Sequence, residues 1–502
     1  MASALAASVG SPMRVGARAP SRATARRASV GAGPVRPAVS TLGRAAIASS
    51  ARPRLARRGD VSGPRAAFLS PFGANTLEAP EETAESSGDS GSSAERRRKR
   101  LLRLKIDGEW YDCTGWAKAH PGGSLFITLM DGCDATDVFY ALHSYGPNGD
   151  DTAARRLAML PRCQGPEDDE EAFVGHAERM PRAENSPHTF AEYSAPADAK
   201  FAELRSKFER EGWFARDPLK EAAVLATTLG LYALGWILAA NAHPWLAALS
   251  LGLGMQQAGW LAHDYIHGRG RWCGFMRGFG SLTNGFSTEW WQHKHNMHHS
   301  FTNIDGRDGD IKLEPLYCLQ DPKETGRPDN PTLRRWQHWY GYPLYAFTYA
   351  LWRRHSLASA IERRDTKELG LLAIHYAWLF TCLPLGVALG SILIGGFLVG
   401  ALVTATHQTE EIMFEQNTQF VDAQFRSTRE ADVSSGFEKF LWGGMDTQLV
   451  HHLFPTMPRY RHHAAREVIQ KWAAEHGYDF RISSSAEILG KNFNHLKALA
   501  HI

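Results

Sequence analysis

Histidines gather in three short stretches of this 502-residue chain, and imidazole is a common protein ligand for iron, zinc and copper. The richest stretch, residues 290–299, reads WWQHKHNMHH. If it is helical, His295, His298 and His299 stand at i, i+3 and i+4 and project from one face. We therefore expect this segment to bind metal. Because histidine clusters also occur on solvated surfaces, the other two stretches have to support this interpretation.

Two further stretches share the same spacing. His263 and His267 form an HxxxH pair one helical turn apart, and Gln448, His451 and His452 form a QxxHH group. A single HxxxH pair arises easily by chance. Three such stretches, each near an apolar segment, form a specific pattern. We expect them to converge and to bind two metal ions.

Two other histidines could lie near the metal ligands. His407 stands alone after an apolar segment, and two roles stay open for it: a metal ligand, or a residue that contacts the ligands through water. His293 precedes the ligand histidines of its own stretch, and we expect it at most to support them.

A different metal chemistry is indicated near the start of the globular sequence. The motif HPGG presents His120 on a tight turn, and the stretch GCDATDVF leads to His143. Two histidines on separate loops could hold a haem from both faces, which suits one-electron transfer. The segment resembles a cytochrome b5 domain, and on that resemblance His120 and His143 are the axial ligands of a haem b. We assign residues 101–165 to this α+β domain.

The elements that must position the other histidines are apolar helices. Four apolar segments are visible, at residues 222–240, 245–262, 369–389 and 392–406. A membrane-spanning helix needs about 20 such residues. We predict two transmembrane hairpins, the second turning at Gly390, in a mainly α-helical membrane domain over residues 221–502. Lys and Arg crowd the ends away from the two turns, so these ends and all three histidine stretches are expected on one side, as a metal-binding cap.

The remaining segments are typical of a targeting peptide and of linkers. Residues 1–59 contain eleven Arg but no Asp, Glu or Lys, a composition typical of organelle transit peptides. We assign a disordered transit peptide to residues 1–68 and a linker to residues 69–100. A second linker with an amphipathic helix before the membrane covers residues 166–220. The expected location is a chloroplast membrane, with the endoplasmic reticulum membrane as the alternative.

Whole-chain averages hide this organisation. The net charge is +3 and the mean hydropathy is −0.33, so neither value reveals a membrane protein. Six scattered cysteines without a CxxC pair indicate reduced thiols rather than a disulfide framework or a zinc site. No nucleic-acid partner is expected.

Taken together, the chain resembles a membrane front-end fatty acyl desaturase with an N-terminal cytochrome b5 domain. The family is marked by a Gln that opens the third box, here within QLVHHLFPTMPR at residues 448–459. Leu449 and Val450 depart from the Ile-Glu pair that is common there. The resemblance implies two non-haem irons bound by the following residues: His263, His267, His295, His298, His299, His451 and His452, with Gln448 in or beside the coordination shell.

The resemblance also implies the reaction. Such an enzyme uses O₂ and electrons from its own haem domain to insert a cis double bond between an existing double bond and the carboxyl end of a lipid-linked acyl chain. The expected electron donor is a ferredoxin or a cytochrome b5 reductase. A sphingoid long-chain base desaturase of the same architecture stays open as an alternative, as does a lipid hydroxylase.

Overall fold

The computed structural model describes residues 101–143, 152–165, 196–414 and 418–502. The predicted transit peptide, the linker at 69–100 and most of the second linker lie outside the described residues. The described chain is mainly helical, with two small two-stranded sheets.

The first part of the described chain is a small α+β unit, as expected. Strands β1 (Arg103–Ile106) and β2 (Glu109–Asp112) pair antiparallel around a turn at Asp107 and Gly108, both with positive φ. The short helices η1 (Ala117–Ala119), α1 (Ser124–Leu129), α2 (Thr136–His143) and α3 (Thr152–Ala158) complete the unit. Its core is formed by the following residues: Leu104, Ile106, Tyr111, Cys113, Ala117, Ile127 and Ala135.

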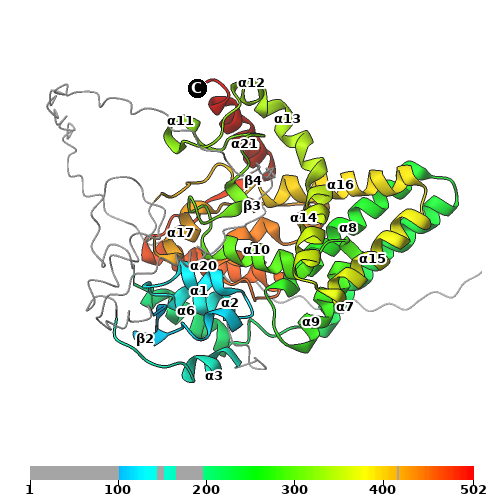
Figure 1. Cartoon of the computed structure of the whole chain (residues 1–502). Helices are drawn as coiled ribbons and strands as arrows, with labels where there is room; N and C mark the ends of the chain where they lie inside the picture. The colour runs from blue at the N-terminus through cyan, green and yellow to red at the C-terminus, as the bar shows by residue number, and fades with distance from the viewer. Residues whose placement is uncertain (1–100, 144–151, 166–195, 415–417) are drawn as a thin grey trace, which may run out of the picture. The chain divides into compact units, whose positions relative to one another are not determined.

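Four apolar helices form the centre of the second part: α7 (Pro218–Ala240), α8 (Pro244–Ile266), α15 (Thr366–Thr381) and α16 (Leu385–Val403). Helix α8 packs against both α7 and α16 (Figure 1). Gly252 of α8 and Gly395 of α16 let two backbones approach closely, since a Cβ on Gly395 would lie 3.1 Å from the Gly252 carbonyl oxygen. Small residues at helix contacts are usual in membrane proteins.

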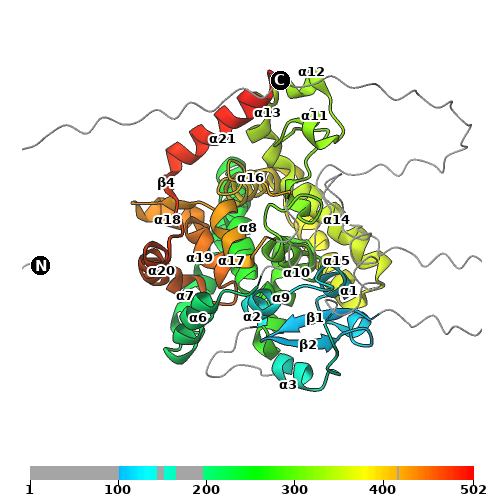
Figure 2. The same cartoon turned by 90° about the vertical axis from the view of Figure 1, so that its left-hand side faces the viewer.

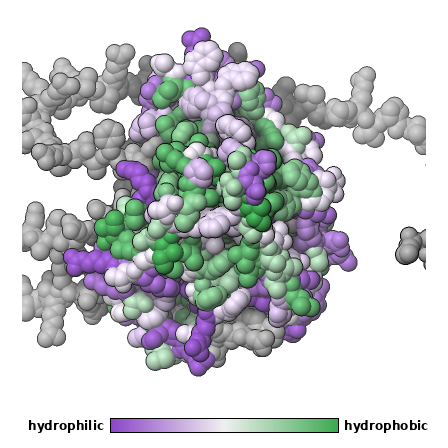
Figure 3. Space-filling view, turned by 90° about the vertical axis from the view of Figure 1, so that its right-hand side faces the viewer, coloured by the Kyte–Doolittle hydropathy of each residue, from purple (hydrophilic) through white to green (hydrophobic). Residues whose placement is uncertain are grey.

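The outer surface of these helices is apolar. Large hydrophobic side chains such as Ile237, Trp245, Ile374 and Leu385 are exposed there, and Figure 3 shows a broad hydrophobic face at this end of the molecule. Among the described helices, two are long and apolar enough to span a membrane by composition, α7 and α16. Exposed apolar surface of this extent indicates contact with lipid.

The second helical turn lies elsewhere than the sequence predicts. Helix α15 ends at Thr381 and α16 begins at Leu385, whereas Gly390 lies inside α16. The physical reason is Pro384, which has no backbone N–H and cannot continue a helix. The hydropathy pattern does not show this break, because the residues on both sides of Pro384 are apolar.

The chain between the two hairpins consists of shorter helices. These are α9 (Gly270–Asn284), α10 (Thr288–Ser300), η3 (Gly309–Ile311), α11 (Pro322–Thr325), α12 (Pro331–Arg334), α13 (Gln337–Leu344), η4 (Tyr345–Phe347) and α14 (Thr348–Glu362). Helix α10 packs against α8, α9, α14 and η3. This packing places the histidine-rich helix at the end of the apolar bundle.

The C-terminal part closes over the same end. Its elements are α17 (Phe420–Ser427), β3 (Glu430–Asp432), α18 (Gly436–Trp442), η5 (Met445–Thr447), α19 (Gln448–Leu453), η6 (Arg459–Arg461), α20 (His462–His476), β4 (Ile482–Ser484) and α21 (Ser485–Leu499). Strands β3 and β4 pair in parallel. The amphipathic helix expected before the membrane is α6 (Ala199–Arg210). Its apolar residues Phe201, Leu204 and Phe208 are buried in the protein against α19 and α20 (Figure 2).

Candidate metal centre

Helix α10 carries the longest histidine stretch and begins with a defined cap. The Ser287 side chain accepts a hydrogen bond from the Trp290 N–H, and Glu289 stands in the first turn, where a negative charge favours the helix. Trp290 and Trp291 are buried in the main hydrophobic core. These contacts fix the rotation of α10, which decides where each histidine points.

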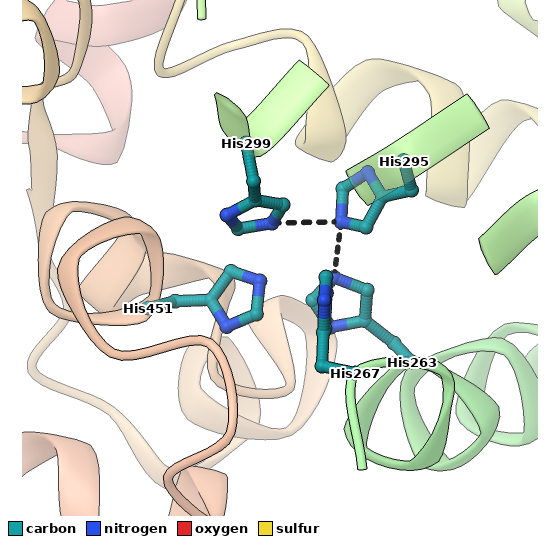
Figure 4. A group of neighbouring side chains, drawn as sticks. All are labelled: His263, His267, His295, His299 and His451. Atoms are coloured by element: carbon teal, nitrogen blue, oxygen red, sulfur yellow. Dashed lines mark hydrogen bonds between the residues drawn. The ribbon is translucent and has the colours of Figure 1, made fainter. Parts of the chain in front are cut away.

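A first group of five histidines meets between three helices (Figure 4). His263 comes from α8 and His267 from its C-terminal end, His295 and His299 from α10, and His451 from α19. One ring nitrogen of each lies within 4.8 Å of the others. The Nε2 atoms of His263 and His295 are 2.7 Å apart. The convergence expected of the three stretches is therefore present.

A second group lies beside the first. His298, His407 and His452 bring ligand atoms within 4.8 Å of one another. Gln448 places its amide nitrogen 3.2 Å from Nε2 of both His407 and His452. The structure thus makes His407 a member of this group, and the Gln448 side chain lies directly beside the rings of His407 and His452.

The two His-His pairs divide between the groups. His298 and His299 are neighbours in sequence but face different groups, as do His451 and His452. Successive residues on a helix point about 100° apart, since one turn takes 3.6 residues. The expectation of a single shared face for His295, His298 and His299 is therefore too coarse, because His298 serves the second group.

The outer ring nitrogens are held by hydrogen bonds that sequence reasoning did not find. In the first group, Nδ1 of His267 lies 2.8 Å from Oδ1 of Asn296. In the second, Nδ1 of His298 donates to Asp308 at 2.8 Å, Nδ1 of His407 to the Ser427 carbonyl at 2.9 Å, and Nδ1 of His452 to Gln424 at 2.9 Å. Such partners fix the tautomer and leave Nε2 free to bind a metal. No local sequence signal links these partners to the histidines.

The electrostatics keep these rings neutral. Burial, followed by the neighbouring histidines, lowers the pKa of His295, His299, His451 and His452 well below the usual value. Neutral imidazole is the form that coordinates metal. Among the described residues, Nε2 of His267 and of His451 are buried without a hydrogen-bond partner. Buried, neutral and unpartnered nitrogens fit metal ions that bind imidazole, such as iron.

Replacing Asp308 with asparagine tests whether the hydrogen-bond partners of the histidines support metal binding. The Asp308 carboxylate is fully buried and holds the ring of His298, so the variant should lose roughly 10- to 100-fold in metal affinity. Metal bound per protein, measured by elemental analysis during chelator titration, checks this. Asp432→Asn is the control, because Asp432 is exposed on β3. Unchanged affinity in Asp308→Asn would contradict the supporting role of Asp308.

The two histidines that are expected to bind haem, His120 and His143, also lie close together. The ring centroids of His120 and His143 are 6.1 Å apart, which leaves room for one metal ion bonded at about 2 Å to each ring. Nδ1 of His120 donates to the Gly123 carbonyl at 3.1 Å, and Nδ1 of His143 donates to the Phe139 carbonyl at 2.7 Å. Nε2 of each ring is therefore the atom that would bind a haem iron. Burial, together with the positive charge of Arg269, lowers the pKa of both histidines.

A cavity opens onto the two histidine groups. Its lining includes His263, His295, His298, His407 and Gln448. The rest of the wall is largely apolar and includes the following residues: Ile311, Leu313, Leu319, Trp352, Val403 and Ile412. The empty space amounts to about 1060 Å³, including the space at the mouth. An apolar chain in this cavity would contact the ring nitrogens of the two groups only at the histidine-lined wall.

His293 belongs to neither group. Instead of supporting the ligands, its Nδ1 donates a hydrogen bond to the Gly122 carbonyl in the small α+β unit, at 2.8 Å. The structure therefore places His293 outside both groups, at a contact with the small α+β unit.

Two family models match separate parts of the chain. Residues 240–484 match the model described as fatty acid desaturase. Residues 94–159 match the model of a cytochrome b5-like haem/steroid binding domain. The first match contains every histidine of both groups, and the second contains His120 and His143.

Curated relatives are similar over most of their length. The Delta(6)-fatty-acid desaturase fat-3 of Caenorhabditis elegans is 28% identical over 443 residues, or 80% of this chain and 96% of that protein. The Delta(5) fatty acid desaturase fat-4 of the same organism is 28% identical over 76% of this chain and 91% of its own. The acyl-lipid 8-desaturase of Rebecca salina is 28% identical over 80% of this chain and 92% of its own.

Proposed function

Since this chain belongs to the fatty acid desaturases that carry an N-terminal cytochrome b5 domain, we propose that it is a front-end acyl-lipid desaturase. It is an oxidoreductase that uses O₂ and inserts a cis double bond between an existing double bond and the carboxyl end of the chain. The observation that carries the proposal is the meeting of two histidine groups in a chain that also carries a bis-histidine haem unit. The family and these histidines imply haem and a di-iron site.

The ligand sets follow from the two groups. We assign one iron to His263, His267, His295, His299 and His451, and the other to the second group. In that second set, His298, His407 and His452 would supply ring nitrogens. The Gln448 side chain would supply its amide oxygen once its end group rotates. Reduced iron in such a site supplies the chemistry of O₂ activation, which redox-inactive zinc does not.

The remaining residues of the site bind and orient the substrate. The apolar wall of the cavity suits an acyl chain, because such a chain is recognised by shape and by removal from water. His263, His295 and His298 line the same cavity, so the chain passes beside both iron sets. Each turnover removes two hydrogen atoms from adjacent carbons. Together with O₂, two electrons and two protons, these give two molecules of water.

The proposed membrane arrangement follows from the helices. Helices α7 and α8 form one hairpin and α15 and α16 the other, so that both return to the side that carries the histidines. Support comes from the apolar exposed surface and from Arg216, Arg353 and Arg364 near the returning ends. The haem unit then lies on the same side as the di-iron site. The proposed location is a chloroplast membrane, with ferredoxin or a cytochrome b5 reductase as donor.

A lipid profile of yeast that expresses the chain tests the function. We expect a new cis double bond on the carboxyl side of an existing one in glycerolipid acyl chains, when mono- and polyunsaturated acids are supplied. Lipid-class-resolved mass spectrometry measures the position of the bond. The full chain and the chain without residues 1–68 are compared, which also tests the assigned transit peptide.

Two other products would contradict the proposal. A new double bond only in sphingoid long-chain bases would identify a long-chain base desaturase. A hydroxylated chain without a new double bond would identify a hydroxylase. Fluorescent fusions of residues 1–75 in an algal or plant cell test the proposed chloroplast location separately. A signal at the endoplasmic reticulum would contradict that location.

A further inference from the structure

His293 forms a direct contact between the helix of the iron ligands and the haem unit. It lies on α10, two residues before His295, and its Nδ1 donates to the Gly122 carbonyl at 2.8 Å. Gly122 is part of the HPGG motif that begins with His120. His293 thus joins the loop of a haem ligand to the helix of three iron-site histidines by a single hydrogen bond.

The contact is closely packed. The ring of Phe126 meets the His293 ring edge to face, with centroids 5.6 Å apart. A Cβ at Gly123 would lie 2.7 Å from Cε1 of His293, and Gly123 also has a φ of +93°. The second glycine of the motif therefore leaves the space that the imidazole occupies. A larger residue there would push His293 away from the haem loop.

The surrounding surfaces hold the two units together. Phe126 is buried in one hydrophobic cluster with Met297 of α10 and with Phe301, the residue that follows this helix. At a separate place, Nε2 of Gln419 donates to Oδ2 of Asp137 at 2.8 Å. The Arg205 guanidinium lies 3.6 Å from the centroid of the Tyr140 ring. The His293 bond is therefore one of several contacts, but it alone connects a haem-ligand loop with α10 by a hydrogen bond among those the structure describes.

We propose that the His293–Gly122 hydrogen bond is the connection through which electrons pass from the haem unit into the di-iron site. The bonded path runs from the His120 ring along the backbone to the Gly122 carbonyl, across the hydrogen bond to His293, and along α10 to His295. Electron transfer slows steeply across empty space, so a path of covalent bonds and one hydrogen bond is favoured. His293 is a positioning residue, since it belongs to neither ligand set.

This inference rests on the proposed function, which requires two electrons for each desaturation. In each transfer ferrous haem is oxidised to ferric haem, and the di-iron site gains one electron. Two transfers supply the two electrons that one desaturation requires. An external reductant, a ferredoxin or a flavoprotein reductase, reduces the haem again.

Two substitutions of His293 separate the hydrogen bond from the packing. His293→Phe keeps a ring against Phe126 but removes the donor. His293→Asn keeps an N–H donor close to the position of Nδ1 but removes most of the ring. After rapid mixing of reduced full-length protein with O₂ and substrate, we expect haem reoxidation to slow by about tenfold or more in His293→Phe, because the hydrogen bond that joins the haem loop to α10 is lost. His293→Asn is expected to retain a rate close to that of the parent.

Further measurements distinguish a lost connection from a damaged site. The haem midpoint potential, the rate of haem reduction by the external reductant and the iron content are expected to be unchanged in His293→Phe. Hydrogen exchange at the amides of residues 120–126, which does not depend on turnover, is expected to increase where the bond is lost. Gln419→Ala is the matched control, because it removes a contact between the units away from the proposed path.

The outcomes are decisive. A parent-like reoxidation rate in His293→Phe would overturn the inference, as would equal slowing in Gln419→Ala, which would show that docking in general controls the rate. If the parent protein forms no desaturated product, the proposed function itself fails. If the parent forms product and His293→Phe is unaffected, only the role of His293 fails.

Discussion

Replacing His298 with alanine is expected to abolish desaturation while the haem spectrum stays unchanged. His298 is one of three histidines of the second group, and Asp308 holds its ring in place. Loss of the ligand leaves that iron with too few nitrogens, so activity should fall by at least about 100-fold, more than supporting residues usually contribute. Product formation, iron per protein and the reduced-minus-oxidised haem spectrum are measured in the same membranes.

The control for this variant is His501→Ala, since His501 is exposed near the C-terminus. It should keep full activity and full iron content. A His298→Ala protein that still forms product, or that still binds two irons with parent affinity, would contradict the assignment of the second ligand set. Loss of the haem spectrum would instead indicate that the whole protein misfolds.

Replacing His120 with alanine is expected to remove the haem absorbance and, with it, most of the desaturation. The ring of His120 lies opposite that of His143 with both Nδ1 atoms engaged, so either histidine alone leaves one face of the haem without a ligand. The iron content of the di-iron site should stay unchanged, because His120 belongs to neither histidine group. Absorbance, iron content and product yield are compared in full-length protein.

Lys118→Ala serves as the control, since Lys118 is exposed on η1, two residues before His120. It should retain haem and activity. Addition of separate reduced cytochrome b5 to His120→Ala is expected to restore part of the activity, as the di-iron site is intact. Unchanged haem absorbance in His120→Ala would show that the axial ligand is a different residue.

The haem unit shows how far sequence reasoning reaches when a motif is local. The HPGG turn, the short hairpin and the helix that ends at His143 all depend on contacts within a few residues or between adjacent elements. Both histidines accordingly meet as expected. What the sequence did not reveal is the use of Gly123, whose missing side chain makes room for His293, a residue 170 positions later.

The apolar helices were predictable in number but not in their limits. Hydropathy identifies helices α7, α8, α15 and α16 because lipid-facing and buried helices both require apolar side chains. It placed a turn at Gly390 because glycine interrupts the pattern. Pro384 is the actual break, as the missing N–H is a stronger constraint on a helix than the missing side chain. Likewise, α6 is amphipathic because it packs on protein.

The sequence by itself determined which residue types could bind metal and which segments carry them, because spacing along a helix is a local property. Only the tertiary structure decided how these residues are divided between the two metal-binding groups. His298 and His299 point in different directions from α10, so adjacent residues join different groups. His407 reaches His298 only because the folded chain brings distant segments together. Asp308 lies just ten residues after His298, but the turn that carries it back to the ring shows no sequence repeat.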